Sequence, residues 1–331
     1  MKKVPPIKEK PWKSFLNIWE RYKDFILLQM EREWKNVRKN SIISKHIDFN
    51  TLCIPIREKM TLYLNPDDEG FSKEFYWGGF REPLNTYFLY HEIKKRKCEV
   101  IDIGSNIGYF ALIELVAGAN NVIGIEPIPQ TLGYLTKNLR KFKNFNAKNI
   151  AIGNKNGKMK LYITKKFNLT SFNKSFLDFY KIKIVDTINI VSYTISSLIR
   201  ELPSSPNVLR MDIEGCEYDV LMGRIPDSID LICMELHSIY LGKEKVKKLL
   251  QYFDDLGFKC KWFIHDMSFT LFPLCKVFGI IKTYTMLNFP RQIESENNPM
   301  IPLIEKNKEM KELIEDNRLK KINSLHLFLE R

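Results

Sequence analysis

The sequence predicts an α/β fold with a doubly wound, mostly parallel sheet of seven strands, of the Rossmann-like type. From Cys98 onward, apolar runs, glycine-containing turns and helical segments follow one another in the order that helical crossovers between parallel strands require. The first of these runs leads into a glycine turn that opens a helix. With 44% hydrophobic and 12% aromatic residues, the chain has the composition of a protein that buries a sizeable core.

An N-terminal extension, residues 1–70, is expected to precede this domain. Residues 12–39 carry apolar and aromatic side chains at three- and four-residue intervals, which predicts one or two amphipathic helices. Residues 51–64 predict a short strand pair before a turn-rich segment. Aromatic residues at this spacing usually pack against a core, although a helix that lies on a membrane or on a partner is left open.

The main domain is expected over residues 71–331. Its principal strands are predicted at 99–103, 122–126, 148–152, 207–213 and 229–236. Short strands that complete the sheet are predicted at 158–164, 258–264 and 322–330. Helices are predicted at 108–117, 129–141, 194–201, 216–222 and 243–256.

Residues 267–320 are predicted to form a lid or an insertion in the main domain. Their first part, 267–287, is rich in apolar residues but contains two lysines, a proline and a glycine. A bilayer span needs roughly 20 apolar residues without such interruptions, so no transmembrane helix is expected. Contact of this segment with a lipid-linked substrate is left open.

The composition also bears on partners and location. Lys and Arg outnumber Asp and Glu by 52 to 39, and the net charge is +13. Such a charge favours polyanionic partners, but an evenly solvated basic surface explains it equally well. The 6 cysteines form no CxxC pair, so neither a zinc site nor a disulfide framework is predicted. Because prolines and Glu9 interrupt the start of the chain, no signal peptide is expected and the predicted location is cytoplasmic.

The segment VIDIGSNIGYF at residues 100–110 is the main candidate for a cofactor site. Ligands of open α/β sheets bind at the carboxyl ends of the strands, where this turn is expected to lie. Gly104 suits a tight turn, and Gly108 is expected to let the backbone approach a ligand. Positions 106 and 109 are Asn and Tyr, so the three-glycine pattern of nicotinamide-binding proteins is not met. An NAD-dependent dehydrogenase is therefore disfavoured, and D-x-G-x-x-x-G is typical of enzymes that use S-adenosylmethionine.

The second strand ends in an acidic residue, Glu126, which is followed by Pro127. A carboxylate at this position can accept hydrogen bonds from both ribose hydroxyls of a nucleoside. Glu126 is therefore the predicted ribose ligand.

Further acidic residues follow the fourth and fifth strands. Asp212 and Glu214 follow the fourth strand, and Glu235 and His237 end the fifth. These side chains are expected to converge at one edge of the sheet. His237 is the first candidate for a general base that deprotonates a hydroxyl, and Asp212 is the second. The carboxylates also suit a divalent cation, but their spacing is not a recognised ligand set, so no metal is predicted.

Four stretches in this order resemble the FkbM-type methyltransferase family: VIDIGSNIGYF (100–110), GIEP (124–127), NIAIG (149–153) and RMDIEGCEYDVL (210–221). The resemblance covers roughly residues 80–265. It implies a Rossmann-like methyltransferase fold and an enzyme that uses S-adenosylmethionine to methylate oxygen, notably hydroxyls of sugars and polyketide-type metabolites.

The resemblance also implies roles for individual residues. The implied cofactor-binding residues are Asp102, Gly104, Ser105, Asn106, Gly108, Glu126, Pro127, Ala151 and Asp212. The implied catalytic residues are His237, Asp212, Glu214 and Glu235. Arg210 stands where a lysine is common in the family, and this exchange changes hydrogen-bond geometry.

The expected acceptor is a small molecule or glycan with a hydroxyl, either free or attached to a lipid or protein carrier. A nucleic-acid methyltransferase is the alternative, disfavoured because no NPPY-like segment or RNA-binding module is present. A non-catalytic cofactor-binding or scaffold protein is a further alternative. Contact with a membrane surface and the oligomeric state are left open.

Overall fold

The computed structural model describes residues 10–40, 42–267, 271–288, 302–322 and 324–331. For residues 10–23 and 286–288 it describes the backbone alone.

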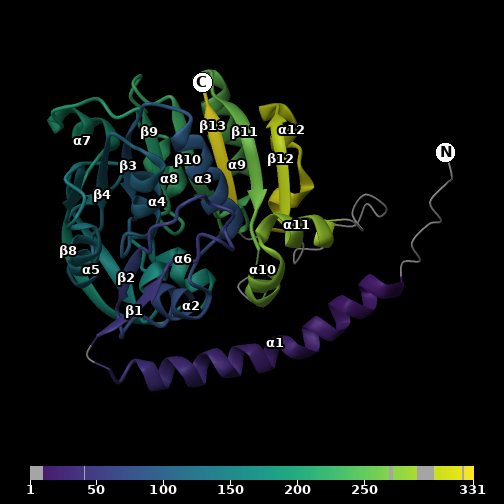
Figure 1. The fold of residues 1–331 in the computed structure, drawn as a ribbon. Coiled ribbons are helices and arrows are strands. Elements are labelled where there is room, and N and C mark those ends of the chain that lie inside the picture. The colour runs from purple at the N-terminus through teal and green to yellow at the C-terminus, as the bar shows by residue number, and fades with distance from the viewer. Residues whose placement is uncertain (1–9, 41, 268–270, 289–301, 323) are drawn as a thin grey trace.

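A central sheet of eight strands organises the part of the chain that the structure describes, one strand more than the predicted seven (Figure 1). The strand order is β12 (Leu303–Lys308), β11 (Lys259–His265), β13 (Leu325–Glu330), β10 (Leu231–Leu236), β9 (Val208–Met211), β3 (Glu99–Ile103), β4 (Asn121–Ile125) and β5 (Phe145–Lys148). The five strands from β10 to β5 are parallel to one another, and β13, β11 and β12 are joined to them by antiparallel pairing.

The order of the parallel strands fixes where a ligand can bind. The chain passes from β3 to β4 and β5 on one side, and it later returns to β9 and β10 on the other side of β3. The crevice at such a switch point, outside the carboxyl ends of the strands, is the general ligand site of doubly wound sheets. The predicted fold class is confirmed, and the switch point lies between β3 and β9.

Helices cover both faces of this sheet because alternate strand residues are apolar on both sides. Val100 and Val208 face one hydrophobic core, whereas Ile101 and Leu209 face the other. The first core is built with α2 (Phe71–Gly78), α3 (Pro83–Lys94), α4 (Tyr109–Ala117) and α5 (Pro129–Leu139). The second core is built with α7 (Ile195–Glu201), α8 (Glu217–Leu221), α9 (Ser238–Asp255) and α12 (Met310–Ile314).

A second sheet of three strands lies apart from the central one. Its order is β6 (Ala151–Ile152), β8 (Ile184–Tyr193) and β7 (Gly157–Thr164), and α6 (Lys174–Phe179) lies between β7 and β8 in the chain. The strand predicted at 158–164 therefore exists but does not extend the central sheet. The strand predicted at 148–152 is divided, because the Asn149 side chain donates to the carbonyl oxygens of Glu126 and Pro127 and turns the chain between β5 and β6.

The N-terminal extension contains a single long helix, α1 (Lys10–Val37), and a strand pair (Figure 1). β1 (Ile43–His46) pairs with β2 (Thr61–Leu64), so the predicted position of the first strand, within 51–64, is wrong. Asp48 accepts hydrogen bonds from the backbone and side chain of Thr51, which folds that segment into a turn. Asn138 of α5 bonds to both Tyr63 and the carbonyl oxygen of Ile107, and so connects the extension to the glycine turn.

The segment predicted as a lid or insertion, 267–320, forms several elements. α10 (Phe272–Phe278) and α11 (Ile280–Asn288) make a helical hairpin, and β12 joins the edge of the central sheet. Residues 268–270 and 289–301 lie outside the described residues. None of the described helices is both long enough and apolar enough to cross a bilayer.

Candidate active site

A cavity of about 460 Å³ opens at the switch point between β3 and β9. This volume lies in the usual range for small-molecule sites, about 300–1,000 Å³. One side is lined by the predicted cofactor residues Gly104, Ser105, Asn106, Glu126, Pro127 and Ala151. The other side is lined by the predicted catalytic residues Asp212, Glu214, Glu235 and His237. Thus two sets of residues that are far apart in sequence share one cavity.

The glycine turn that follows β3 is shaped by its contact with β9. Gly104 has a φ of 80°, and a Cβ atom there would collide with the carbonyl oxygen of Asp212. Asn106 also has a positive φ, 50°, and its side-chain oxygen accepts from the backbone N–H of Ile107. Glycine at position 104 therefore allows the two strand ends to approach, which places Asp212 beside the cofactor turn.

The structure gives Gly108, for which a ligand-related role is predicted, a packing role. It does not line the cavity, and a Cβ atom there would lie 2.8 Å from a terminal carbon of Leu135. Gly108 therefore permits α4 to pack against α5 rather than permitting the backbone to approach a ligand.

Glu126 lies at the end of β4 and points into the cofactor side of the cavity. Its carboxylate accepts hydrogen bonds from the backbone N–H groups of Asn106, at 3.0 Å, and Ile128, at 2.9 Å. Each carboxylate oxygen has a second lone pair, so Glu126 can still accept from two ribose hydroxyls. Burial raises the pKa of Glu126 to about 7, although the two backbone donors favour its charged form.

Asp102 acts behind the cavity, not within it. It is fully buried, and its Oδ1 atom accepts from Arg210 at 3.0 Å. The Arg210 guanidinium also donates to the carbonyl oxygen of Gly104 and to Asp212, and it lies over the ring of Phe110 at 4.1 Å. Arg210 is therefore a positioning residue that joins the glycine turn to the acidic end of β9.

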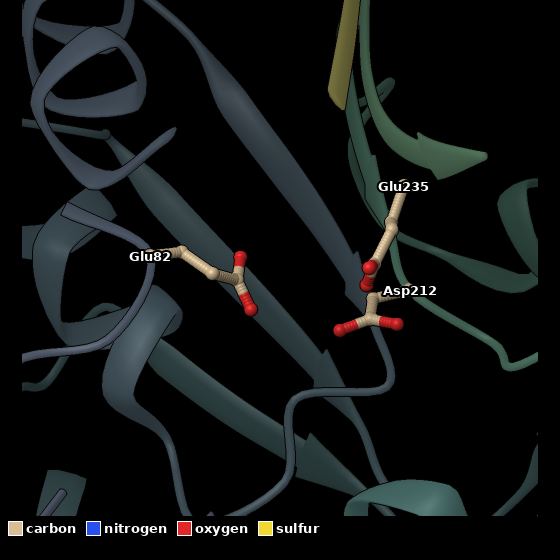
Figure 2. Close-up of side chains that lie close together, drawn as sticks. All are labelled: Glu82, Asp212 and Glu235. Carbon is tan, nitrogen blue, oxygen red and sulfur yellow. The ribbon is translucent and has the colours of Figure 1, made fainter. Parts of the chain in front are cut away.

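Three carboxylates converge on the other side of the cavity (Figure 2). One oxygen each from Glu82, Asp212 and Glu235 lies within 4.8 Å of the others. Burial and the charge of Glu235 raise the pKa of Asp212 well above its usual range. These oxygens could hold a cation, since hard cations prefer carboxylate ligands. That this site holds no metal stays a prediction. A comparison of methyl transfer before and after treatment with a chelator would test it.

Among these three carboxylates, Asp212 has a buried oxygen without a partner among the described residues. Its Oδ2 atom accepts from Arg210 at 3.3 Å, whereas its Oδ1 atom is buried without a partner among the described residues. Glu235 accepts from Ser324, and Glu82 accepts from Asn85. An acceptor hydroxyl would satisfy the buried Oδ1 atom of Asp212.

Glu82 was not predicted, and it lies outside the motifs of the sequence. It has a φ of 39°, which is rare for a residue with a side chain and often marks a functional site. Asp266 fixes the start of α3 by accepting from the backbone N–H groups of Leu84 and Asn85. The sequence does contain a signal for Glu82: Arg81 and Glu82 directly precede Pro83, and a proline after charged residues is typical of a helix start. This pattern places a carboxylate at the beginning of a helix.

His237 lies between two acidic side chains. Its Nδ1 atom is 2.5 Å from Glu217, and its Nε2 atom is 3.1 Å from Glu214. Although burial opposes the charge, the two carboxylates raise the pKa of His237 well above its usual range. Both ring nitrogens of His237 are thus engaged by carboxylates, whereas the Oδ1 atom of Asp212 has no partner among the described residues, so the geometry favours Asp212 over His237 as the base. The short contact also identifies Glu217 as the residue that orients His237.

The second sheet and α6 supply a wall of the cavity that the sequence did not predict. It contains the aromatic residues Phe167, Phe172, Phe176 and Tyr180 and the polar residues Lys166 and Asn168. Phe176 makes edge contacts with His237 and Tyr240 at 5.2 and 5.1 Å between ring centroids. This wall gives the cavity an apolar surface beside His237.

Comparison with known proteins agrees with this geometry. Residues 102–260 match the model of the methyltransferase FkbM domain. The sequence matches none of the curated proteins with which it was compared.

Several solved structures show a partial similarity to this chain. The precorrin-6Y C5,15-methyltransferase of Geobacter metallireducens GS-15 is 9% identical, with a TM-score of 0.36 over 74% of this chain and 86% of that chain. The C-terminal domain of the Rhodobacter capsulatus precorrin-6Y C5,15-methyltransferase is 12% identical, with a TM-score of 0.36 over 77% and 92%. TYW2 of P. horikoshii, solved in complex with MeSAdo, is 13% identical, with a TM-score of 0.34 over 62% of each chain. These low TM-scores carry no conclusion about the substrate of this chain.

The resemblance noted in the sequence is thus confirmed at the level of the family. The matched range begins at Asp102, includes Glu126 and Asp212, and ends in β11. Glu82 and Ser324 lie outside it, although both line the cavity. Residues 102–260 of this chain form a methyltransferase domain of the FkbM family.

Proposed function

We propose that this protein is an S-adenosylmethionine-dependent O-methyltransferase whose acceptor is a hydroxyl of a sugar or another small metabolite. The observation that supports it is the shared cavity, in which Glu126 lies at one side and the buried, unpartnered Oδ1 atom of Asp212 lies at the other. The first side suits a nucleoside, and the second suits a group that must lose a proton.

The cofactor side fits S-adenosylmethionine. Glu126 can accept from the ribose hydroxyls, and Ala151 and Ile152 provide an apolar surface for the adenine. The acidic side gives a favourable electrostatic environment for a positively charged sulfonium. When bound, S-adenosylmethionine supplies an activated methyl group.

The protein's own contribution is to orient the acceptor and to take its proton. In its charged form, Asp212 can accept the hydroxyl proton at its Oδ1 atom, and because its pKa is raised, this charged form is a stronger base than an ordinary carboxylate. Glu82 and Glu235 can accept hydrogen bonds from neighbouring hydroxyls of a sugar ring. The aromatic wall, which lies beside His237, limits the access of water to the acceptor.

Direct binding tests the cofactor. S-adenosylmethionine or its demethylated product is expected to bind with a Kd in roughly the micromolar range, about −8 kcal/mol. Isothermal titration calorimetry measures this value, with NADH as the comparison ligand. Binding of NADH without binding of S-adenosylmethionine would contradict the proposed function.

Replacement of Glu126 tests the ribose contact. Glu126→Ala is expected to weaken cofactor binding by about 1.5–3 kcal/mol, the usual value for hydrogen bonds to a charged partner. Calorimetry on the variant measures the loss, and circular dichroism shows whether the fold persists. Glu69→Ala is a matched control because Glu69 does not line the cavity. A folded Glu126→Ala variant with unchanged affinity would show that this carboxylate does not hold the ribose.

The pKa of Glu126 also predicts how affinity depends on pH. With a pKa of about 7, Glu126 becomes charged as the pH rises through neutrality, and the charged form accepts hydrogen bonds more strongly. Cofactor affinity is therefore expected to increase between about pH 6 and pH 8. In Glu126→Gln the same titration should be nearly flat, and a persistent pH dependence in that variant would assign it to another group.

A further inference from the structure

The hairpin formed by α10 and α11 has an apolar apex on the surface of the protein. Val277, Phe278 and Ile281 are exposed by 72%, 39% and 39%. Val277 is the most exposed large hydrophobic residue among those that the structure describes. Gly279, with a φ of 75°, makes the turn between the two helices. We call Val277, Phe278 and Ile281 the hairpin apex.

The other side of the hairpin is anchored in the core. Phe272, Cys275 and Ile280 are buried, and the ring of Phe272 lies 4.4 Å from that of Phe80. The backbone N–H of Ile280 also donates to the carbonyl oxygen of Thr51. The hairpin is therefore held in place, and the exposure of its apex is a property of the folded chain.

The two charged residues of the hairpin, Lys276 and Lys282, are both positive, while Asp48 and Glu33 of neighbouring segments lie near Lys276. Lys276 and Lys282 flank it and are exposed. Lys276 donates to the carbonyl oxygen of Trp77, and Lys282 lies over the ring of Phe278 at 5.5 Å. The sequence contains no Asp or Glu between Asp266 and Glu294. An apolar apex between two lysines, without a nearby acid in the same segment, complements a surface that is apolar beneath an anionic layer.

The helix α1 runs below α10 in Figure 1 and also exposes apolar side chains. Phe25, Leu28, Arg32 and Lys35 are exposed at the spacing of a single helix face. Its opposite face is buried at Met30 and Trp34, and Trp34 contacts Tyr76 of α2. Thus α1 packs on the body with one apolar face and leaves Phe25 and Leu28 open to solvent, in a stretch of mixed charge that also exposes Asp24 and Glu33.

We propose that the hairpin apex, with the exposed Phe25 and Leu28 of α1 as a second apolar contact, binds the surface of an anionic lipid bilayer. Val277, Phe278 and Ile281 enter the boundary between headgroups and acyl chains, and the flanking lysines contact lipid phosphates. Binding is peripheral and depends on both the apolar and the basic residues. It is independent of methyl transfer, because none of these residues lines the cavity.

Vesicle binding by the full chain tests this surface. Cosedimentation is measured with vesicles of phosphatidylcholine and with vesicles of an equimolar mixture of phosphatidylcholine and phosphatidylglycerol. The protein is expected to bind the anionic vesicles, and binding should weaken as salt is added. Lys276→Gln/Lys282→Gln should lower the partition coefficient by about 30-fold, which corresponds to about 1 kcal/mol for each lysine. Val277→Ser/Phe278→Ser should lower it by about tenfold or more.

Matched variants elsewhere on the surface complete the experiment. Val185→Ser/Val191→Ser removes two exposed valines from β8, and Lys158→Gln/Lys160→Gln removes two exposed lysines from β7. Both controls should bind anionic vesicles as the wild type does. If the double variant of the apex does not fold, Val277→Ser alone provides the measurement.

Three results would overturn the assignment. The wild type could fail to bind anionic vesicles, or the apex variants could bind as tightly as the controls. Alternatively, the wild type could form a concentration-dependent dimer that Val277→Ser abolishes, which would assign the apex to a second copy of the chain. Analytical ultracentrifugation without lipid distinguishes this last case.

Discussion

Asp212→Asn is expected to slow methyl transfer by about 10²–10⁴-fold, the usual contribution of a positioned general base. The substitution preserves the size of the side chain and its contact with Arg210, but it removes the proton acceptor. Cofactor affinity should change little, because the loss concerns the chemical step. The rate is measured in single turnovers with labelled cofactor, after a screen of glycans, lipid-linked sugars and small alcohols has identified an acceptor.

Asp219→Asn provides the matched control for this measurement. Asp219 is exposed, does not line the cavity and lies on α8, close to Asp212 in the sequence. Its variant should retain the wild-type rate. An Asp212→Asn variant that transfers methyl groups within about threefold of the wild-type rate would exclude Asp212 as the base. Labelling confined to RNA or to protein nitrogen would instead exclude the acceptor class.

Variants of His237 and Glu217 distinguish a general base from a positioning residue. His237 was the first candidate for the base, but it lies between Glu214 and Glu217. His237→Gln is therefore expected to slow methyl transfer because it displaces these carboxylates. Glu217→Gln should slow it to a similar extent, because it disturbs the same contact. If His237 were the base, His237→Gln would lose far more activity than Glu217→Gln.

Much of the fold followed from the sequence because strand and helix periodicity is local information. β3, β4, β9 and β10 are mostly apolar on both faces, which is what strands buried on both sides require. The sequence of β12, LIEKNK, is mostly polar, and this edge strand is recognisable only through its pairing with β11. The pairing of β6, β7 and β8 into a separate sheet likewise depends on tertiary contacts, which local sequence patterns do not indicate.

The candidate site was predictable where a residue has a local role, and less so where its role depends on packing. Glu126 follows a buried strand, so its place at the edge of the sheet could be inferred. Glu82 reaches Asp212 and Glu235 only because α3 is fixed by Asp266, which lies far away in the sequence. Gly108 was given a ligand-related role because close helix packing and ligand approach both require glycine.

Arg210→Met is expected to lower the free energy of unfolding by about 3–5 kcal/mol, because it leaves the buried Asp102 without its charged partner. The methionine can fill the space above Phe110, but it cannot donate to Asp102, Gly104 or Asp212. Urea denaturation with linear extrapolation measures the change. Arg224→Met is the control, because Arg224 is exposed and its ion pair with Asp227 should contribute less than about 1 kcal/mol.

A second substitution tests the cause of this destabilisation. If the unpaired charge of Asp102 is responsible, adding Asp102→Asn to Arg210→Met should restore part of the lost stability, since an amide is less costly to bury than an unpaired carboxylate. Arg210→Lys should lose less than Arg210→Met, because an ammonium keeps the charge but cannot bond to three separate oxygen atoms in the same geometry. A loss below about 1 kcal/mol in Arg210→Met, or no recovery in the double variant, would show that the pair does not stabilise the fold. Arg210 would then serve only to position Asp212, and its replacement should reduce methyl transfer without a change in the urea midpoint.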